Sequence, residues 1–160
     1  MDIGHFYFLK DEYFERFQDP YLMQNKESVG GQKHGRPCFY SFLDNKTNLF
    51  WMIPISSNIS KFEKIRETKI KKYGRCDTIF FGSIFGKNKV FLVQNMCPST
   101  FDYIESEYVG ADRTHPVLDG AFANSIIVSA KRVLNLQRMG ARIILPDVLK
   151  IEKELLSIGL

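Results

Sequence analysis

The apolar positions of this chain come in short runs, and turn-forming residues separate most of them. Short runs that are rich in aromatic and β-branched residues predict strands rather than helices. Polar segments at 44–48 and 86–88 lie between neighbouring runs and predict two β-hairpins. The strands that we expect are 3–9, 38–43, 49–55, 79–85, 89–94 and 142–145.

Helical spacing of apolar residues predicts the helices between these strands. One helix has a clear start, because Ser60 and Glu63 match the S-x-x-E capping box, and Gly74 is placed to end it. Two polar stretches, 24–36 and 110–120, are expected to be surface loops. The helices that we expect are 11–17, 60–73, 99–108, 121–139 and 146–156.

This order of elements predicts an α+β fold. Because the strands come mostly in hairpins, we expect a compact, mostly antiparallel curled sheet or partial barrel with helices packed outside. The chain has 160 residues, of which 44% are hydrophobic and 14 are Phe, which suits a single domain over 1–160 with an aromatic core. No stretch approaches the ~20 apolar residues of a membrane span.

The cysteines and the N-terminus indicate a cytoplasmic protein. Cys38, Cys76 and Cys97 form no Cys-x-x-Cys pair, so a zinc ribbon or a thioredoxin-like site has no support. Scattered cysteines fit a reducing compartment, and the first residues lack the basic and apolar regions of a signal peptide. We expect no metal and no cofactor.

The positive charge of the chain is concentrated in one predicted helix. Residues 61–75 contain seven basic and two acidic residues, whereas the whole chain has a net charge of only +4. An apolar stripe that includes Phe62, Ile65, Ile70 and Tyr73 should pack inward and leave the cations on the other face. Such a face fits a phosphate backbone, and a solvated face without a partner is the alternative. The RNA-binding candidates here are Lys64, Thr68, Lys69, Lys71, Lys72 and Arg75.

The junction before this helix holds three catalytic candidates, Ser56, Ser57 and Lys61. The serines end a predicted strand, and Lys61 lies at the start of the helix. Hydroxyls, an ammonium group and the free amides of a helix N-terminus can together surround one phosphate and stabilise a pentacovalent phosphorane. Serines at a strand end also often bond only to loop amides, so this pattern leaves both interpretations open.

Residues 33–36 should lie close to the same junction. In a hairpin the start of the first strand is near the end of the second, so the residues just before Cys38 should approach Ser56 and Ser57. His34 is therefore a candidate general base, since imidazole titrates near neutral pH. Lys33 and Arg36 are candidate phosphate ligands. A loop histidine and arginine that contact only solvent are the alternative.

Several segments carry a resemblance to a known family. They are Phe-Tyr-Phe-Leu at 6–9, Trp-Met-Ile-Pro-Ile-Ser-Ser at 51–57 with Lys61 soon after, Cys-Asp-Thr-Ile at 76–79, and Gln-Asn-Met-Cys-Pro at 94–98. Together they resemble the CptN/TenpN (ToxN-like) family of type III toxin–antitoxin endoribonucleases. The resemblance extends over nearly the whole chain. Three residues, Asn-Ile-Ser, separate Ser57 from Lys61 where ToxN-like members have a single proline, so Lys64 is a second candidate for the family's lysine.

The resemblance implies a fold and an activity. The fold would be a compact barrel similar to the MazF/Kid toxins. The activity would be metal-independent cleavage of single-stranded RNA, including cellular mRNA, to 2′,3′-cyclic phosphate and 5′-hydroxyl ends. The partner would be a small antitoxin RNA pseudoknot that the toxin excises from a repeated precursor and that inhibits it in a closed protein–RNA assembly. The setting would be phage defence in the bacterial cytoplasm.

Two functions of other classes stay open on the sequence. A non-catalytic RNA-binding module could use the same basic helix, 61–75, and would bind RNA in a salt-sensitive way without cutting it. A cysteine hydrolase could use Cys38 or Cys97, but it would need a thiol with a lowered pKa.

Overall fold

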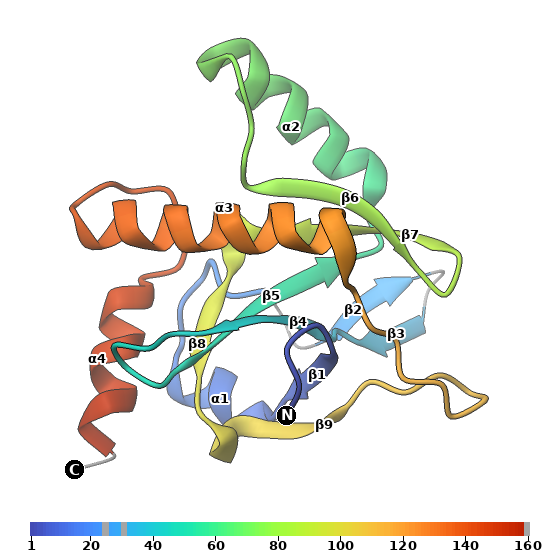
Figure 1. The fold of residues 1–160 in the computed structure, drawn as a ribbon, viewed down its shortest axis with the longest axis horizontal. Coiled ribbons are helices and arrows are strands. Elements are labelled where there is room, and N and C mark those ends of the chain that lie inside the picture. The colour runs from blue at the N-terminus through green and yellow to red at the C-terminus, as the bar shows by residue number, and fades with distance from the viewer. Residues whose placement is uncertain (24–25, 30–31, 159–160) are drawn as a thin grey trace.

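In the part of the chain that the structure describes, seven strands form one sheet, and four helices lie outside it. The computed structural model describes residues 1–23, 26–29 and 32–158, and the side chains of 26–29 and 32–34 lie outside its description. The elements, whose helices and strands are labelled in Figure 1, follow in this order: β1 (Phe6–Leu9), α1 (Asp11–Arg16), β2 (Lys26–Val29), β3 (Gln32–Gly35), β4 (Cys38–Leu43), β5 (Phe50–Ser56), α2 (Ile59–Tyr73), β6 (Ile79–Ile84), β7 (Lys87–Leu92), the 3₁₀ turn η1 (Val93–Asn95), β8 (Cys97–Ser99), the 3₁₀ turn η2 (Phe101–Tyr103), β9 (Ile104–Glu107), α3 (Gly120–Arg138) and α4 (Val148–Ile158).

The main sheet runs in the order β6-β7-β5-β4-β1-β9, and β8 pairs with β5 outside this path. Each of its strand pairs is antiparallel. Strand β5 pairs with β4 along one edge, while its other edge pairs first with β8 and then with β7. Because two different strands share that edge, the sheet curls around β5. The expected α+β class and antiparallel sheet are confirmed.

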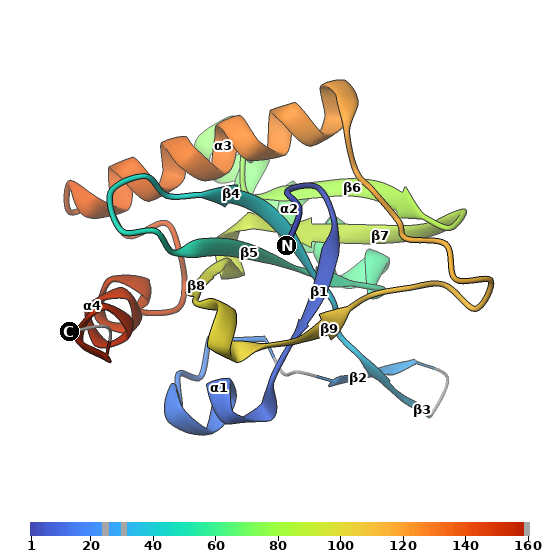
Figure 2. The same ribbon diagram turned by 60° about the horizontal axis from the view of Figure 1, so that its bottom comes forward.

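Both faces of the sheet are covered, and the alternation of side chains along β5 shows how. Trp51, Ile53 and Ile55 pack in one cluster with residues of α3, whereas Met52 packs on the other side with residues of α1 and α4. Figure 2 shows α3 along one side of the sheet and α1 on the opposite side. Strands that are buried on both faces need apolar residues at nearly every position, which explains the continuous apolar runs of β4 and β5.

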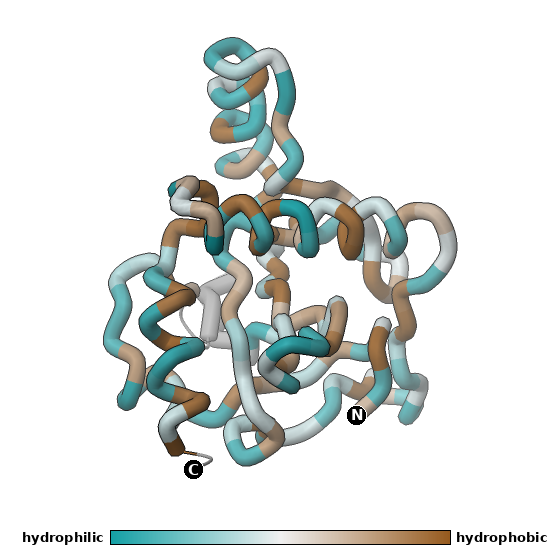
Figure 3. The backbone as a smooth tube through the Cα atoms, turned by 60° about the vertical axis from the view of Figure 1, so that its left-hand side comes forward, coloured by the Kyte–Doolittle hydropathy of each residue, from teal (hydrophilic) through white to brown (hydrophobic). Residues whose placement is uncertain are grey.

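Helix α2 stands out from the body of the protein, as Figures 1 and 3 show. Its N-cap is Asn58, whose side chain accepts a hydrogen bond from the amide of Lys61. The expected capping box on Ser60 is therefore wrong by two residues. Gly74 ends the helix in the left-handed conformation, at φ 82°, as expected. Phe62 is buried against β6 and β7, but Tyr73 is 66% exposed, so the expected inward packing does not reach the last turn.

Three other expectations are corrected by strand pairing and loop contacts. The segment expected as a loop at 24–36 contains the β2–β3 hairpin. The helix expected at 99–108 is instead η2 followed by β9, which pairs with β1. The strand expected at 142–145 is irregular, because the amides of Ile143 and Ile144 both donate to the side-chain oxygen of Gln137. The remaining expected helices and strands are confirmed, with ends that differ by a few residues.

In the part of the chain that the structure describes, no helix has both the length and the apolar sequence needed to cross a membrane.

Candidate active site

Ser57 lies where β5 ends, and a lysine from the neighbouring strand reaches it. The Lys89 Nζ donates a hydrogen bond of 2.6 Å to the Ser57 Oγ. The register of β5 against β7 pairs Ser56 with Val90, which places Lys89 beside Ser57. Both side chains are only partly buried, so the pair of hydroxyl and ammonium is open to a ligand.

Ser56 stabilises the turn that follows strand β5. Its side chain is buried, and its Oγ accepts a hydrogen bond of 3.1 Å from the amide of Asn58. This contact fixes the chain between the end of β5 and the first turn of α2. Ser56 therefore helps to hold Ser57 and the helix N-terminus in place. Its expected catalytic role stays a prediction.

Arg36 supports the same strand end from the other side. Its side chain is only 8% exposed, and its Nη1 donates a hydrogen bond of 2.8 Å to the main-chain oxygen of Ile55. The expectation that the residues before Cys38 approach the two serines is confirmed, because Gly35 and Pro37 line the same cavity as Ser57. Arg36 thus positions the end of β5 by its contact with Ile55.

A cavity of about 550 Å³ opens beside Ser57. Aromatic rings form much of its wall: Phe8 and Tyr108 are stacked with centroids 5.7 Å apart, and Phe85 lies 5.8 Å from Tyr108. Gly35 makes room for this arrangement, since a Cβ there would come within 2.8 Å of the Phe8 ring. The described residues that line the cavity are Phe6, Phe8, Gly35, Pro37, Ile55, Ser57, Ile84, Phe85, Lys87, Asn88, Lys89, Tyr108 and Val109.

The cavity is suited to an anion. Lys87 and Lys89 are the charged groups among the described residues that line it, and none of those lining residues is acidic. A second hollow, of about 350 Å³, shares Lys89 with the first and is bordered by Ile59 and Glu63 of α2. Lys89 therefore lies between the aromatic cavity and the N-terminal turn of the basic helix.

The two lysines that the sequence put forward lie elsewhere on α2. The ammonium of Lys61 lies over the ring of Phe62, 5.3 Å from its centroid. Lys64 is exposed, and its main-chain oxygen accepts a hydrogen bond from the Thr68 hydroxyl. Neither lysine is among the residues that line the two hollows. The catalytic role of either lysine stays a prediction.

Two other cations, one in α2 and one just after it, form contacts within the protein. Lys69 forms a hydrogen bond within the protein: its Nζ donates to the side-chain oxygen of Gln94 at 2.5 Å. Arg75, just past the helix, bonds to Asp77, and Arg132 of α3 bonds to the same carboxylate. Partial burial raises the pKa of Asp77, but these two arginines outweigh it and hold the pKa below its ordinary value. The group left on the exposed surface of the helix is Lys61, Lys64, Lys71 and Lys72.

His34 and Lys33 have side chains outside the described residues. Their main chains belong to β3, where His34 pairs with Glu27 and Lys33 with Ser28. Gly35, the last residue of the same strand, lines the aromatic cavity. The expected roles of His34 as a base and Lys33 as a phosphate ligand stay predictions.

The thiols do not fit a nucleophile. Cys38 and Cys97 are buried, and burial raises the pKa of the Cys38 thiol well above its ordinary value and that of Cys97 to about 11. A cysteine hydrolase needs a lowered thiol pKa. The structure therefore opposes the hydrolase interpretation.

Lys89 and the aromatic wall are the features that the sequence did not reveal. The sequence predicts a strand that begins at Lys89, and a single lysine in a strand carries no signal of its own. The useful signal would have been the pairing of β7 with β5, because it places the residue before Val90 next to Ser57. That pairing joins strands from two separate hairpins, and local sequence does not specify it.

Comparison with solved structures identifies a relative in fold. The structure reported as "Structure and activity of AbiQ, a lactococcal anti-phage endoribonuclease belonging to the type-III toxin-antitoxin system" superposes with a TM-score of 0.69 over 97% of each chain. This chain has the AbiQ fold. The two sequences are only 11% identical, so the likeness concerns the fold. Comparisons with protein-family models and with curated proteins find no match.

The likeness to AbiQ spans nearly all of both chains, so it includes the curled sheet around β5 and the segments that border the cavity. A ToxN-like fold was the expectation from the sequence resemblance, and the agreement in fold confirms it.

Proposed function

We propose that this protein is the toxin of a type III toxin–antitoxin system and a metal-independent endoribonuclease. The observation that carries the proposal is the Ser57–Lys89 pair at an aromatic cavity with a cationic lining. The fold of AbiQ, an endoribonuclease of that class, supports it. The resemblance of residues 51–57 and 94–98 to ToxN-like toxins supports it independently.

The cavity suits one nucleotide of a single-stranded RNA. Stacked aromatic rings such as Phe8 and Tyr108 bind bases of any sequence through their faces. The ammonium groups of Lys87 and Lys89 would hold the phosphates on either side of that base. Duplex RNA keeps its bases stacked inside the helix, so a cavity of this kind selects unpaired RNA.

The proposed reaction is attack of a ribose 2′-hydroxyl on the neighbouring phosphorus. A new bond forms between the 2′-oxygen and phosphorus, the bond from phosphorus to the 5′-oxygen breaks, and the products carry a 2′,3′-cyclic phosphate and a 5′-hydroxyl. Ser57 would orient the phosphate, and Lys89 would neutralise the charge that grows on its non-bridging oxygens.

Two proton transfers complete the reaction. The 2′-hydroxyl must lose a proton to a base, and His34, on the strand that leads to the cavity, is our candidate. The 5′-oxygen must gain a proton, and Lys61 or Lys89 is our candidate donor. The exposed cations of α2 would bind the flanking RNA backbone.

The same surfaces would recognise the inhibitor. A folded antitoxin RNA that the toxin excises from its own repeated precursor must occupy the cleavage site when processing ends. We therefore expect one RNA to contact both the cavity and α2, in a closed protein–RNA assembly that blocks access of cellular mRNA.

The test is cleavage of a long unstructured RNA by the purified protein in EDTA, with the fragment ends identified by mass spectrometry. We expect 2′,3′-cyclic phosphate ends. The Ser57→Ala variant should cut at least about 100-fold more slowly, as loss of a preorganised hydroxyl at a transition-state oxyanion does. Ser157→Ala, an exposed serine on α4, is the matched control and should cut at the wild-type rate.

Each other result has a definite meaning. Binding to RNA that weakens with salt, without any cleavage, would favour the non-catalytic RNA-binding module. Cleavage that survives Ser57→Ala would keep the endoribonuclease and overturn the site. Cleavage that stops in EDTA while the protein stays folded and still binds RNA would overturn the metal-independent mechanism.

A further inference from the structure

Two histidines and one glutamate meet on the face of β1 opposite the cavity. Phe6 and Phe8 line the cavity, so His5 and Tyr7, at alternate positions, face the other way. Glu107 of β9 is the direct partner of Tyr7 across the strand pair and shares that face. His115, from the loop between β9 and α3, approaches the same carboxylate.

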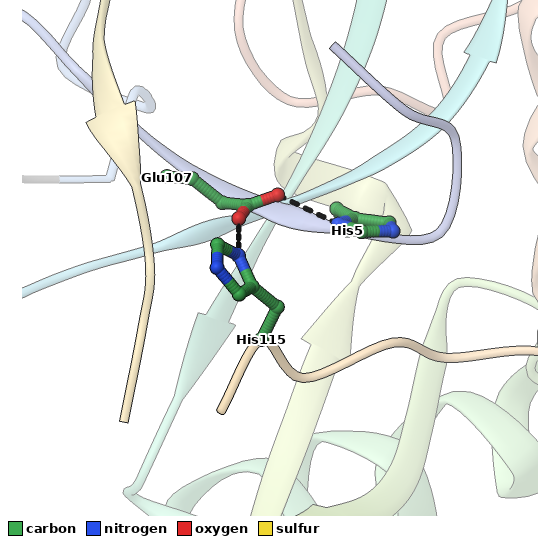
Figure 4. Close-up of side chains that lie close together, drawn as sticks. All are labelled: His5, Glu107 and His115. Carbon is green, nitrogen blue, oxygen red and sulfur yellow. Dashed lines mark hydrogen bonds and ion pairs between the residues drawn. The ribbon is translucent and has the colours of Figure 1, made fainter. Parts of the chain in front are cut away.

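The three side chains present their ligand atoms to one point. The His5 Nδ1 lies 2.6 Å from one carboxylate oxygen of Glu107, and the His115 Nδ1 contacts the other oxygen. Figure 4 shows one ring facing each oxygen. One ligand atom from each residue lies within 4.8 Å of those of the other two. The ligands of a tetrahedral zinc ion, at ~2.0–2.1 Å from the metal, lie about 3.4 Å apart, so small side-chain rotations that lengthen the present histidine–carboxylate contacts would admit one ion among the three ligands.

We propose that His5, Glu107 and His115 form a binding site for a zinc ion or a similar late first-row divalent metal. Neutral imidazole nitrogens and a carboxylate oxygen are the ligands that such metals take. The metal would replace the protons that now join the two rings to the carboxylate. The His115 side chain is 52% exposed, so solvent can reach the site and a water molecule can complete the coordination.

The metal site would stabilise the structure and would take no part in breaking the RNA phosphodiester bond. It joins three separate segments: the residue before β1, strand β9, and the loop that precedes α3. Tyr108 and Val109 follow Glu107 directly and line the cavity beside Ser57. A bound metal would therefore fix one wall of the cavity from behind. The proposal does not depend on the proposed ribonuclease activity.

The experiment is zinc binding by the whole chain after removal of metal with a chelator and dialysis. We expect one zinc ion per chain by titration calorimetry, and a rise of several degrees in the melting temperature when zinc is added, because a ligand that binds only the folded state stabilises it. In His115→Ala and His5→Ala, binding should weaken by at least about tenfold, since even the loss of an outer partner of a metal ligand has that effect. The matched control is His34→Ala, which removes the third histidine of the chain and should bind zinc as the wild type does.

Cobalt(II) provides a second readout of the ligand set. We expect visible absorption bands of a four-coordinate nitrogen and oxygen site, without the near-ultraviolet band of a thiolate. Three results would overturn the proposal: no zinc binding in the titration, equal zinc binding in His115→Ala, or a thiolate band that disappears in Cys76→Ser. Because His115 lies on an exposed loop, its variant should fold, and an unchanged circular dichroism spectrum will verify this.

Discussion

At the residue scale, the proposed chemistry depends on which lysine acts together with Ser57 on the phosphate. The sequence favours Lys61 because it begins the next helix, and Lys64 follows one turn later. The structure brings Lys89 to the hydroxyl at 2.6 Å, while the Lys61 ammonium lies over Phe62. A fixed cation within hydrogen-bond distance needs little reorganisation when charge develops on a phosphate, and this favours Lys89.

We predict that Lys89→Met lowers the single-turnover rate of RNA cleavage by about 100-fold or more, as removal of a preorganised donor to an oxyanion does. The measurement is a quenched time course with saturating protein. Lys150→Met, an exposed lysine on α4, should cut normally and controls for the loss of one charge. If Lys61→Met loses activity while Lys89→Met keeps it, the assignment from the sequence is right and Lys89 only supports Ser57.

At the element scale, α2 combines weak attachment with strong charge. Phe62 is its buried residue, and the helix projects from the body, as Figure 3 shows. Lys61, Lys64, Lys71 and Lys72 are exposed on it. Lys89 lies between the cavity and the first turn of α2. An RNA backbone that leaves the cavity past Lys89 can therefore continue along the basic helix. Its cations should therefore contribute to affinity and much less to the rate of the chemical step.

We predict that Lys64, Lys71 and Lys72 changed together to Gln weaken binding to single-stranded RNA and make it less dependent on salt. Each phosphate contact contributes about 0.7 to the slope of log affinity against log salt, so the slope should fall by about 2. Fluorescence anisotropy at several salt concentrations, in a Ser57→Ala background, measures it. The control triple, Lys131, Lys150 and Lys153 to Gln, removes the same charge from α3 and α4. Equal effects of the two triples would contradict a specific role for α2.

At the scale of the whole molecule, a partly buried ionic cluster joins three distant elements. Arg138, at the end of α3, donates to Asp44 in the β4–β5 turn at 2.6 Å and also to Glu152 of α4. Partial burial raises the pKa of Asp44, but hydrogen bonds from Arg138, Thr47 and the Lys46 amide outweigh it, so the pKa lies below its ordinary value. A carboxylate whose pKa falls on folding stabilises the folded state while it is ionised.

We predict that Asp44→Asn lowers the free energy of unfolding by about 1.5–3 kcal/mol at neutral pH, the usual contribution of hydrogen bonds to a charged group. The contribution of Asp44 is complete above its unfolded pKa of about 3.9 and is lost as the pH falls through the lower folded pKa. The difference between wild type and variant should therefore shrink below about pH 4. Urea unfolding over a series of pH values measures this.

The control for this series is Asp102→Asn, which changes an exposed aspartate in η2. Exposed substitutions of this kind usually alter the free energy of unfolding by less than about 0.5 kcal/mol. A difference between wild type and Asp44→Asn that stays constant down to pH 2 would contradict an ionised role for Asp44.

Much of the fold could be predicted from the sequence because it depends on local contacts. The β4–β5 and β6–β7 hairpins form between neighbouring runs, and α2 ends at Gly74 because glycine adopts the left-handed conformation easily. The serines at the end of β5 were also found in this way. Hairpin geometry alone predicts that Ser56 and Ser57 lie close to residues 35–37.

The tertiary structure decided what depends on contacts between distant segments. The segment 104–107 has the residues of a short helix, but pairing with the edge of β1 makes it a strand. Ser57 meets Lys89 because β7 pairs with β5, and His5 meets Glu107 and His115 although more than 100 residues separate them. Pairings of this kind are selected by burial and packing of the whole chain, and they are absent from the pattern of any one segment.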